Sequence, residues 1–237
     1  MLILALDSTA AISTAALCKD GKKLAEYCLD TGNTHSETLL PMIESMLKTT
    51  GRTIDDIDLF AFTAGPGSFT GVRIGAATVK GLAFGRNKPC VGVSAPEALA
   101  YNLREFNGLI CPVINARRSQ VYNALFKAED GKLTRLCPDR IITTKELDTE
   151  LSQINDNIML CGDAYEMTLK DMESTQKIIP TPSALRDICG YSVALCAKDY
   201  YQAGNFTTDS QLLPDYLRPS QAERERLENQ SNLNKIQ

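Results

Sequence analysis

Three short apolar runs open the chain, and each has the length of a β-strand. They cover residues 2–6, 11–18 and 23–28, and the polar turn KDGK joins the last two. Apolar runs bounded by turn residues predict strands, and an Asp-Gly turn between two of them predicts a β-hairpin. The start of the chain is therefore expected to form three neighbouring strands.

A later segment repeats this order of elements. Residues 109–136 again contain an apolar run, a polar turn, a second run, a DGK turn and a third run. Asp7 then falls opposite Asn115, and the two DGK turns match at nearly the same offset. Near-equal offsets favour a duplicated unit, the alternative being a chance match of short hairpins. We predict two related α/β lobes and a flexible tail, at residues 1–107, 108–219 and 220–237.

Three further segments have the pattern of helices that pack on a sheet. Residues 34–51, 94–103 and 182–201 place apolar side chains three and four positions apart. The first two segments begin with Thr or Ser followed three residues later by Glu, which is the pattern of a capping box. The apolar stripe of the first helix consists of Leu39, Met42, Ile43 and Met46.

The stretch AGPGSFTGVRIGAATVKGLAF, residues 64–84, predicts a glycine-rich turn that opens a helix. It matches neither the P-loop nor the dinucleotide-binding pattern, although a helix N-terminus after GPGS could still hold an anion through its free N–H groups. From Phe69 to Phe84 the only charges are Arg73 and Lys80, which lie on one face. Most of this helix is therefore expected to be covered.

Small residues form a groove along one side of the same helix. Each internal glycine costs on the order of 1 kcal/mol relative to alanine, and close approach of another backbone would offset that cost. We predict a partner helix in this groove, and the alternative is burial within the chain's own lobe. The predicted interface residues here are Gly71, Arg73, Gly75, Thr78 and Leu82.

Composition narrows the class of protein. The chain has 237 residues and a formal net charge of −4, so no broad basic surface is expected, and a partner would supply most contacts to any bound RNA. The N-terminal apolar run stops at Asp7 and is too short to span a membrane. Eight scattered cysteines without a C-x-x-C pair indicate core residues in a reducing compartment. We expect a cytoplasmic protein.

The residues after the first strand resemble the first phosphate turn of the actin, Hsp70 and sugar-kinase superfamily. In those enzymes an aspartate orients magnesium or water, and a neighbouring glycine lets backbone N–H groups approach phosphate. Here Asp7 is followed by Ser8 and Thr9, and the second lobe offers Asn115, a neutral amide that is neither a base nor a strong magnesium ligand. We predict a vestigial phosphate turn at these four residues and no catalytic residue.

His35 is the only histidine in the chain. A histidine-based metal site needs further ligands, and neither H-E-x-x-H nor H-x-x-x-H occurs. Ser68 lies outside any G-x-S-x-G motif, so a Ser-His hydrolase is not expected. We predict no metal site and a structural role for His35 at the start of a helix.

Five stretches together resemble the bacterial TsaB family, also called YeaZ-like. They are LALDSTA at 4–10, HSETLLP at 35–41, the glycine-rich stretch at 64–84, NARRSQVY at 115–122 and PDYLRP at 214–219. The resemblance covers nearly the whole chain up to Pro219 and implies a duplicated, two-lobed ASKHA fold, like that of actin, Hsp70 and sugar kinases. The family usually has DAR where this chain has Asn115, which weakens the case for nucleotide chemistry in the second lobe.

The resemblance further implies a non-catalytic subunit of a tRNA-modifying complex. TsaB pairs with TsaD, which transfers threonylcarbamoyl to adenosine 37 of tRNAs that read ANN codons, and the ATPase TsaE joins them. ATP and metal are expected on those partners and not on this chain. The helix at 35–41 and the glycine-rich helix are expected to form the docking surface for TsaD, and isolated protein is expected to form a homodimer through it.

Two other classes of function stay open. A free-standing ASKHA-type ATPase or kinase would use the cleft between the lobes, but Asn115 and the glycine-poor first turn disfavour it. A glycoprotease-like peptidase is disfavoured by the single histidine.

Overall fold

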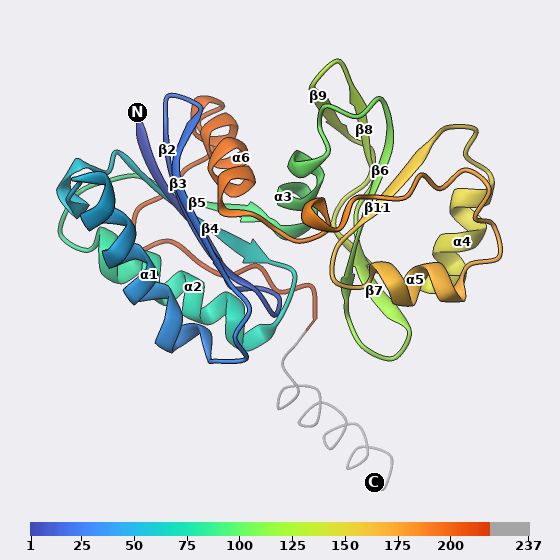
Figure 1. Ribbon diagram of the computed structural model, residues 1–237, viewed down its shortest axis with the longest axis horizontal. Helices are drawn as coiled ribbons and strands as arrows, with labels where there is room; N and C mark the ends of the chain where they lie inside the picture. Colours follow the sequence, from blue (N-terminus) through green and yellow to red (C-terminus); the bar gives the residue numbers. More distant parts are fainter. Residues whose placement is uncertain (219–237) are drawn as a thin grey trace, which may run out of the picture.

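The first sheet of the protein is built from residues in the N-terminal half of the chain (Figure 1). In the computed structural model, which describes residues 1–218, its five strands run in the order β3-β2-β1-β4-β5. The first three strands are antiparallel neighbours, and β4 and β5 continue the sheet in parallel with β1. The bounds are β1 Leu2–Asp7, β2 Ser13–Lys19, β3 Lys22–Leu29, β4 Leu59–Gly65 and β5 Cys90–Ser94.

The second sheet repeats this arrangement with two broken strands. β6 takes the place of β1, β7 and β8 both pair with it antiparallel, β9 and β10 lie outside them, and β11 runs parallel to β6. The bounds are β6 Gly108–Asn115, β7 Gln120–Asn123, β8 Phe126–Glu129, β9 Lys132–Arg135, β10 Arg140–Thr143 and β11 Ile158–Cys161. The duplicated α/β unit predicted from the sequence is therefore confirmed by strand order and direction.

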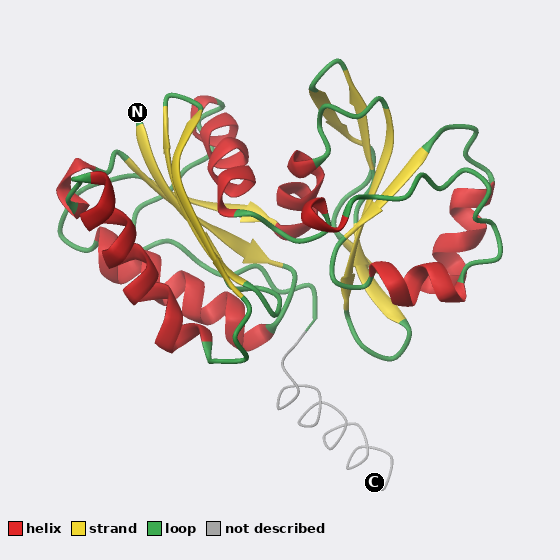
Figure 2. Ribbon diagram, in the orientation of Figure 1, coloured by secondary structure: helices red, strands yellow, loops and turns green. Residues whose placement is uncertain are grey.

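Helices cover both faces of each sheet (Figure 2). The outer face of the first sheet carries α1 and α2, and the outer face of the second carries α4 and α5. Two helices lie between the sheets, where α6 packs on β1 and β2 while α3 packs on β6. The bounds are α1 His35–Thr50, α2 Phe69–Ala83, α3 Ala95–Asn102, α4 Thr144–Ser152, α5 Tyr165–Asp171 and α6 Gly190–Gln202, with 3₁₀ turns at Ile54–Asp56 and Ser183–Leu185.

The helix expected over 182–201 is two elements. The 3₁₀ turn at Ser183–Leu185 is followed by α6, which begins only at Gly190. A Cβ at Gly190 would lie 2.8 Å from the backbone nitrogen of Ala16, so α6 approaches β2 more closely than any other residue would allow. The Gly190 N–H also donates to Thr14 Oγ1 at 3.1 Å. Cys189, with φ −107° and ψ 144°, is extended and is the N-cap of α6, so the helix does not run back through residues 186–189.

The predicted lobe boundary at residues 107 and 108 separates the two sheets but not all of their helices. α6 lies beyond that boundary and packs on the first sheet, and the segment after it pairs with β5 through Cys90 and Thr207. The partition at 1–107 and 108–219 stays a prediction, and the predicted tail at 220–237 lies outside the described residues. Within residues 1–218, no helix is long and apolar enough to cross a membrane.

Candidate functional site

The turn after β1 carries the aspartate of the predicted phosphate turn. The Asp7 side chain is 1% exposed, and its Oδ1 accepts hydrogen bonds from the backbone N–H of Thr9 at 3.1 Å and from the Thr9 hydroxyl at 2.7 Å. Its Oδ2 has no hydrogen-bond partner among the described residues, and neither has the Oγ1 of Thr63 on β4. Burial raises the pKa of Asp7, and the hydrogen bonds from Thr9 oppose that rise. The Asp7 carboxylate therefore stabilises the turn that follows β1.

Ser8 is locked against the first turn of α2. Its hydroxyl donates to the carbonyl oxygen of Gly71 at 2.8 Å, and a Cβ at Gly71 would lie 1.8 Å from the Ser8 carbonyl oxygen. A Cβ at Gly75 would lie 2.9 Å from Ser8 Oγ. The predicted close approach of a backbone is present at Gly71, but the approaching segment is the chain's own turn after β1, and at Gly75 the neighbouring atoms are side chains of the same lobe. The prediction that Gly71 and Gly75 face a partner is wrong for this reason.

The turn after β6 repeats the side-chain hydrogen bond of the Asp7 turn with a neutral side chain. Asn115 Oδ1 accepts the backbone N–H of Arg117 at 2.8 Å, just as Asp7 accepts that of Thr9 two residues on. The Asn115 backbone N–H donates to Asp163 Oδ1 at 2.8 Å. Burial is the main cause that raises the pKa of Asp163. An amide at position 115 closes an Asx turn as well as a carboxylate does.

The two turns face each other across a cleft between the lobes. The cleft has a volume of about 560 Å³, and its wall includes Thr9, Ser68 and Asn115. Ser68 caps α2 by accepting the Gly71 N–H at 3.3 Å, and its own N–H donates to the Thr9 carbonyl oxygen at 2.8 Å. Asp7 lies behind this wall. The structure therefore brings the predicted residues Thr9 and Asn115 to one cleft and holds the Asp7 carboxylate beneath it.

His35 lies at the N-terminus of α1, as predicted, and pairs with Ser13. Its Nε2 is 2.8 Å from the carbonyl oxygen of Ala10, and since a carbonyl only accepts, Nε2 carries a proton. Its Nδ1 is hydrogen-bonded to the hydroxyl of Ser13, which is 2% exposed. This pair ties the turn after β1 to α1, and Ser68 takes no part in it. Within residues 1–218, no group of three or more His, Cys, Asp or Glu side chains is placed to hold a metal ion.

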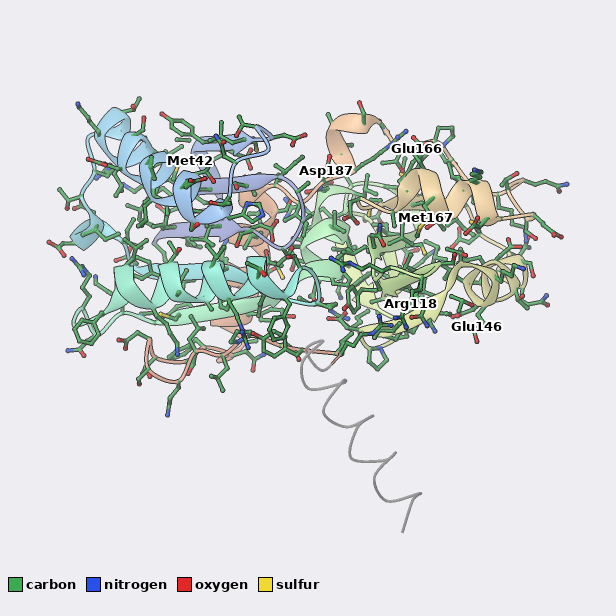
Figure 3. All side chains as sticks on the ribbon, turned by 90° about the horizontal axis from the view of Figure 1, so that it is seen from below. Met42, Arg118, Glu146, Glu166, Met167 and Asp187 are labelled. Carbon is green, nitrogen blue, oxygen red and sulfur yellow. The ribbon has the colours of Figure 1, made fainter. Side chains whose placement is uncertain are left out.

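The predicted interface stripe on α1 faces inward. Its side chains are at most 4% exposed and belong to the outer core of the first lobe, where α1 packs on β2, β3 and α2; they are Leu39, Met42, Ile43 and Met46. Figure 3 labels Met42 on α1. These residues form core rather than a partner surface, which corrects the prediction. An apolar stripe at helical spacing marks the buried face, and here the chain's own sheet covers it.

The opposite side of α1 and α2 is open. Phe84 is 75% exposed and Leu40 is 51% exposed, and a Cβ at Gly81 would meet no atom within 4 Å. Of the residues predicted on the glycine-rich helix, Arg73 is exposed, whereas Thr78 and Leu82 are partly exposed. We call this surface the outer face of α1 and α2; it is defined by Leu40, Arg73, Ala77, Gly81 and Phe84.

Residues 212–218 form a strap across the cleft, for which the sequence predicted no role. The N–H of Asp215 donates to the Ala64 carbonyl oxygen at 2.7 Å, so the strap lies beside the end of β4. Farther along, the Arg218 guanidinium donates to the Ala116 carbonyl oxygen at 3.1 Å. The strap thus joins the two lobes. The stretch PDYLRP was part of the family resemblance, but the sequence alone did not indicate a structural role for it.

The duplicated sheets and the cleft between them define a two-lobed protein of the ASKHA class. A family model described as TsaD, tRNA N6-adenosine threonylcarbamoyltransferase, matches residues 30–203. The tRNA threonylcarbamoyladenosine biosynthesis protein TsaB of Bacillus subtilis is 31% identical over 233 residues, covering 97% of this chain and 100% of that protein. The chain belongs to the TsaB family.

Other relatives and solved structures agree. TsaB of Escherichia coli is 37% identical over 133 residues, covering 55% of this chain and 57% of that protein. The structure of YeaZ from Pseudomonas aeruginosa superposes with a TM-score of 0.77 at 24% identity, covering 91% of this chain and 99% of that one. The ASKHA-like fold predicted from the sequence is thereby confirmed.

Proposed function

We propose that this chain is a non-catalytic subunit that binds a TsaD-type threonylcarbamoyltransferase. In this complex, with a TsaE-type ATPase, it supports threonylcarbamoylation of adenosine 37 in tRNAs that read ANN codons. The observation that carries the non-catalytic part is the state of the two turns: the Asp7 carboxylate is buried and engaged by Thr9, and a neutral Asn115 occupies the matching position. ATP and metal belong, in this proposal, to the partner subunits.

The outer face of α1 and α2 is the surface we assign to the TsaD-type partner. Small side chains at Ala77 and Gly81 let another helix approach closely, and exposed apolar groups at Leu40 and Phe84 lose contact with water on association. The same surface pairs two copies of the chain when the partner is absent, since an apolar patch of this kind favours a two-fold dimer.

The test is co-purification of the full chain with the TsaD homologue of the same cell. Replacing Ala77 by arginine places a long charged side chain on the outer face of α1 and α2 and leaves the core unchanged. The affinity for the TsaD-type partner should therefore fall at least about 30-fold. The circular dichroism spectrum should stay the same as that of the wild type. The matched control is Thr149→Arg on α4, which is also an exposed helical position but lies in the second lobe, and this variant should bind normally. Normal binding by Ala77→Arg would overturn the assignment of this face.

Substitutions in the inward stripe do not test the proposal. Met42→Glu or Met46→Glu buries a charge in the outer core, and Gly75→Leu drives a side chain into Ser8, Leu6 and Phe62. Each of these variants is expected to unfold the first lobe, so loss of partner binding by them would carry no information about the surface.

A further inference from the structure

The arginines of residues 1–218 fall into two groups. One group makes ion pairs with carboxylates of the same chain, and its members are Arg86, Arg104, Arg135, Arg140 and Arg186. The other group has no carboxylate within 4.0 Å in the part of the chain that the structure describes; its members are Arg52, Arg73, Arg117, Arg118 and Arg218. Arg117 and Arg218 line the cleft, Arg73 contacts the cleft-lining residues Phe69 and Tyr216, and Arg118 follows Arg117 in the same turn; we call these four the arginine rim.

Direct contacts connect the members of the arginine rim. Arg73 Nε donates to the Tyr216 hydroxyl at 3.0 Å, and its guanidinium lies 4.0 Å from the ring centre of Phe69. The rings of Phe69 and Tyr216 stack at 4.6 Å and both line the cleft. Two residues after Tyr216, Arg218 donates to Ala116 and Gln120. Those two residues flank the turn that carries the other two arginines, so the rim is continuous from α2 to the second lobe.

That turn is held in a backbone conformation that side chains other than glycine rarely adopt. The φ angles of Arg117, Arg118 and Ser119 are 65°, 56° and 53°, and all three residues are exposed. Consecutive left-handed residues cost free energy, and such strain concentrates at binding sites. The turn is nevertheless closed by hydrogen bonds to Asn115 Oδ1 and Gln120. It presents two neighbouring arginines to solvent at one edge of the cleft, and Arg118 is labelled in Figure 3.

The charges around the rim do not neutralise it. Asp163 and Asp215 also line the cleft, but Asp163 is committed to the Asn115 N–H and neither carboxylate lies within 4.0 Å of a rim guanidinium among the described residues. The chain as a whole has a net charge of −4. Arginines that gather at one place with no carboxylate within 4.0 Å among the described residues repel one another, and an anionic ligand would relieve that repulsion.

We propose that the arginine rim binds the phosphate backbone of the tRNA substrate. This inference rests on the proposed function, which makes an RNA the substrate of the complex. RNA fits the rim better than an acidic protein surface does, because two aromatic rings accompany the guanidinium groups and one of them, Tyr216, is 39% exposed. Guanidinium groups hold phosphate oxygens in pairs, and unstacked bases pack on aromatic rings. The tRNA then bridges both lobes along the strap.

The test measures binding of an unmodified tRNA transcript that reads an ANN codon, by fluorescence anisotropy over a series of salt concentrations. The full chain is used in complex with its TsaD-type partner, and alone if no complex forms. The variant is Arg117→Gln with Arg118→Gln, and the matched control is Arg52→Gln, the unpaired arginine that lies away from the cleft. Arg73 is left unchanged because it also belongs to the outer face of α1 and α2.

The double variant should bind tRNA about 10-fold or more weakly near 0.1 M salt, and the slope of log affinity against log salt should fall by about 1 to 2. Arg52→Gln should match the wild type. Equal affinity and slope for wild type and double variant would overturn the inference, and so would absence of tRNA binding by both chain and complex. If the double variant no longer binds the TsaD-type partner but keeps its affinity for tRNA, the arginine rim contacts the partner protein and not the RNA. Partner binding and tRNA binding are measured separately. A failure of the proposed function can therefore be told apart from a failure of the inference about the arginine rim.

Discussion

The turn after β1 and the turn after β6 occupy matching places in the two lobes, and each is closed by a side-chain oxygen that accepts the backbone N–H two residues on. In the first lobe this oxygen belongs to Asp7, which is 1% exposed, and in the second it belongs to Asn115, which is exposed. The amide performs the turn-closing role without charge. What the two turns share is therefore structural, and the charge of Asp7 is not needed to close the turn.

The lobes differ more in what covers each turn. The first turn is pressed against α2 through Ser8 and Gly71, whereas the second turn projects two arginines into solvent. The first lobe has thus closed its turn under a helix, and the second has left its turn available for contact with another molecule. Substitutions in both turns test this difference, and the contact that closes the first turn should give the largest effect.

Gly71→Ala should produce the largest effect. The new Cβ would stand 1.8 Å from a backbone oxygen, which cannot move without shifting β1 or α2. Overpacking typically costs about 1 to 3 kcal/mol, and a clash between two backbones belongs at or above the top of that range. Urea unfolding followed by circular dichroism measures the loss.

Gly81→Ala is the matched control on the same helix. Its Cβ meets no atom within 4 Å, so only helix propensity changes, and the variant should gain about 0.5 to 1 kcal/mol. If Gly71→Ala were as stable as wild type, the first turn would not be closed by α2 as described.

Asp7→Asn should have a smaller effect that depends on pH. Burial is the largest cause that raises the pKa of Asp7 above its ordinary value of 3.8, so the native state binds this proton more tightly than the unfolded chain does. The stability contributed by this proton is fully present below pH 3.8 and is lost as the pH rises through the raised pKa. The stability of Asp7→Asn relative to wild type should therefore increase with pH across that window and be constant above it.

Urea titrations at a series of pH values check this expectation. Thr168→Val on α5 is the control, because it removes another buried oxygen that has no partner among the described residues, lies in the second lobe away from Asp7 and introduces no titratable group. Its stability difference from wild type should not vary with pH. A pH-independent difference for Asp7→Asn as well would mean that the Asp7 pKa is not raised by folding.

Much of this fold follows from local patterns in the sequence. The three N-terminal strands, the capping box at Thr34 and Glu37 and the left-handed Gly51 after α1 are where the patterns predict them. The duplicated turn pair could also be found, because Asp7 and Asn115 have matching neighbours. Such features depend on hydrogen bonds within a few residues, which a local pattern records.

Features set by distant contacts could not be read in the same way. The stripe through Leu39 and Met46 marks one buried face, but spacing alone does not say whether a sheet or a partner covers it. Gly71 signals close approach of a backbone without saying which one. The return of α6 to the first sheet and the strap at 212–218 depend on contacts between residues more than a hundred positions apart, such as Arg73 with Tyr216.

The smallest effect is expected in catalysis. Phosphoryl transfer in two-lobed enzymes of this class needs carboxylates that hold magnesium and orient water, and removal of one such positioned group typically costs about 10² to 10³ in rate. Here Asp7 Oδ1 is occupied by Thr9 and the side chain lies behind the cleft wall, while Asn115 offers no charge. The chain should therefore hydrolyse ATP no faster than buffer.

In a reconstituted mixture with the TsaD-type and TsaE-type partners, Asp7→Asn should form threonylcarbamoyladenosine on tRNA within about 2-fold of the wild-type rate, because the amide still closes the turn as Asn115 does. Asn115→Asp, which restores the second carboxylate, should leave ATP hydrolysis by the chain at the buffer level. If Asp7→Asn binds its partner normally and yet product formation drops by 10² or more, the Asp7 carboxylate takes part in the chemistry and the two turns differ in function as well as in charge.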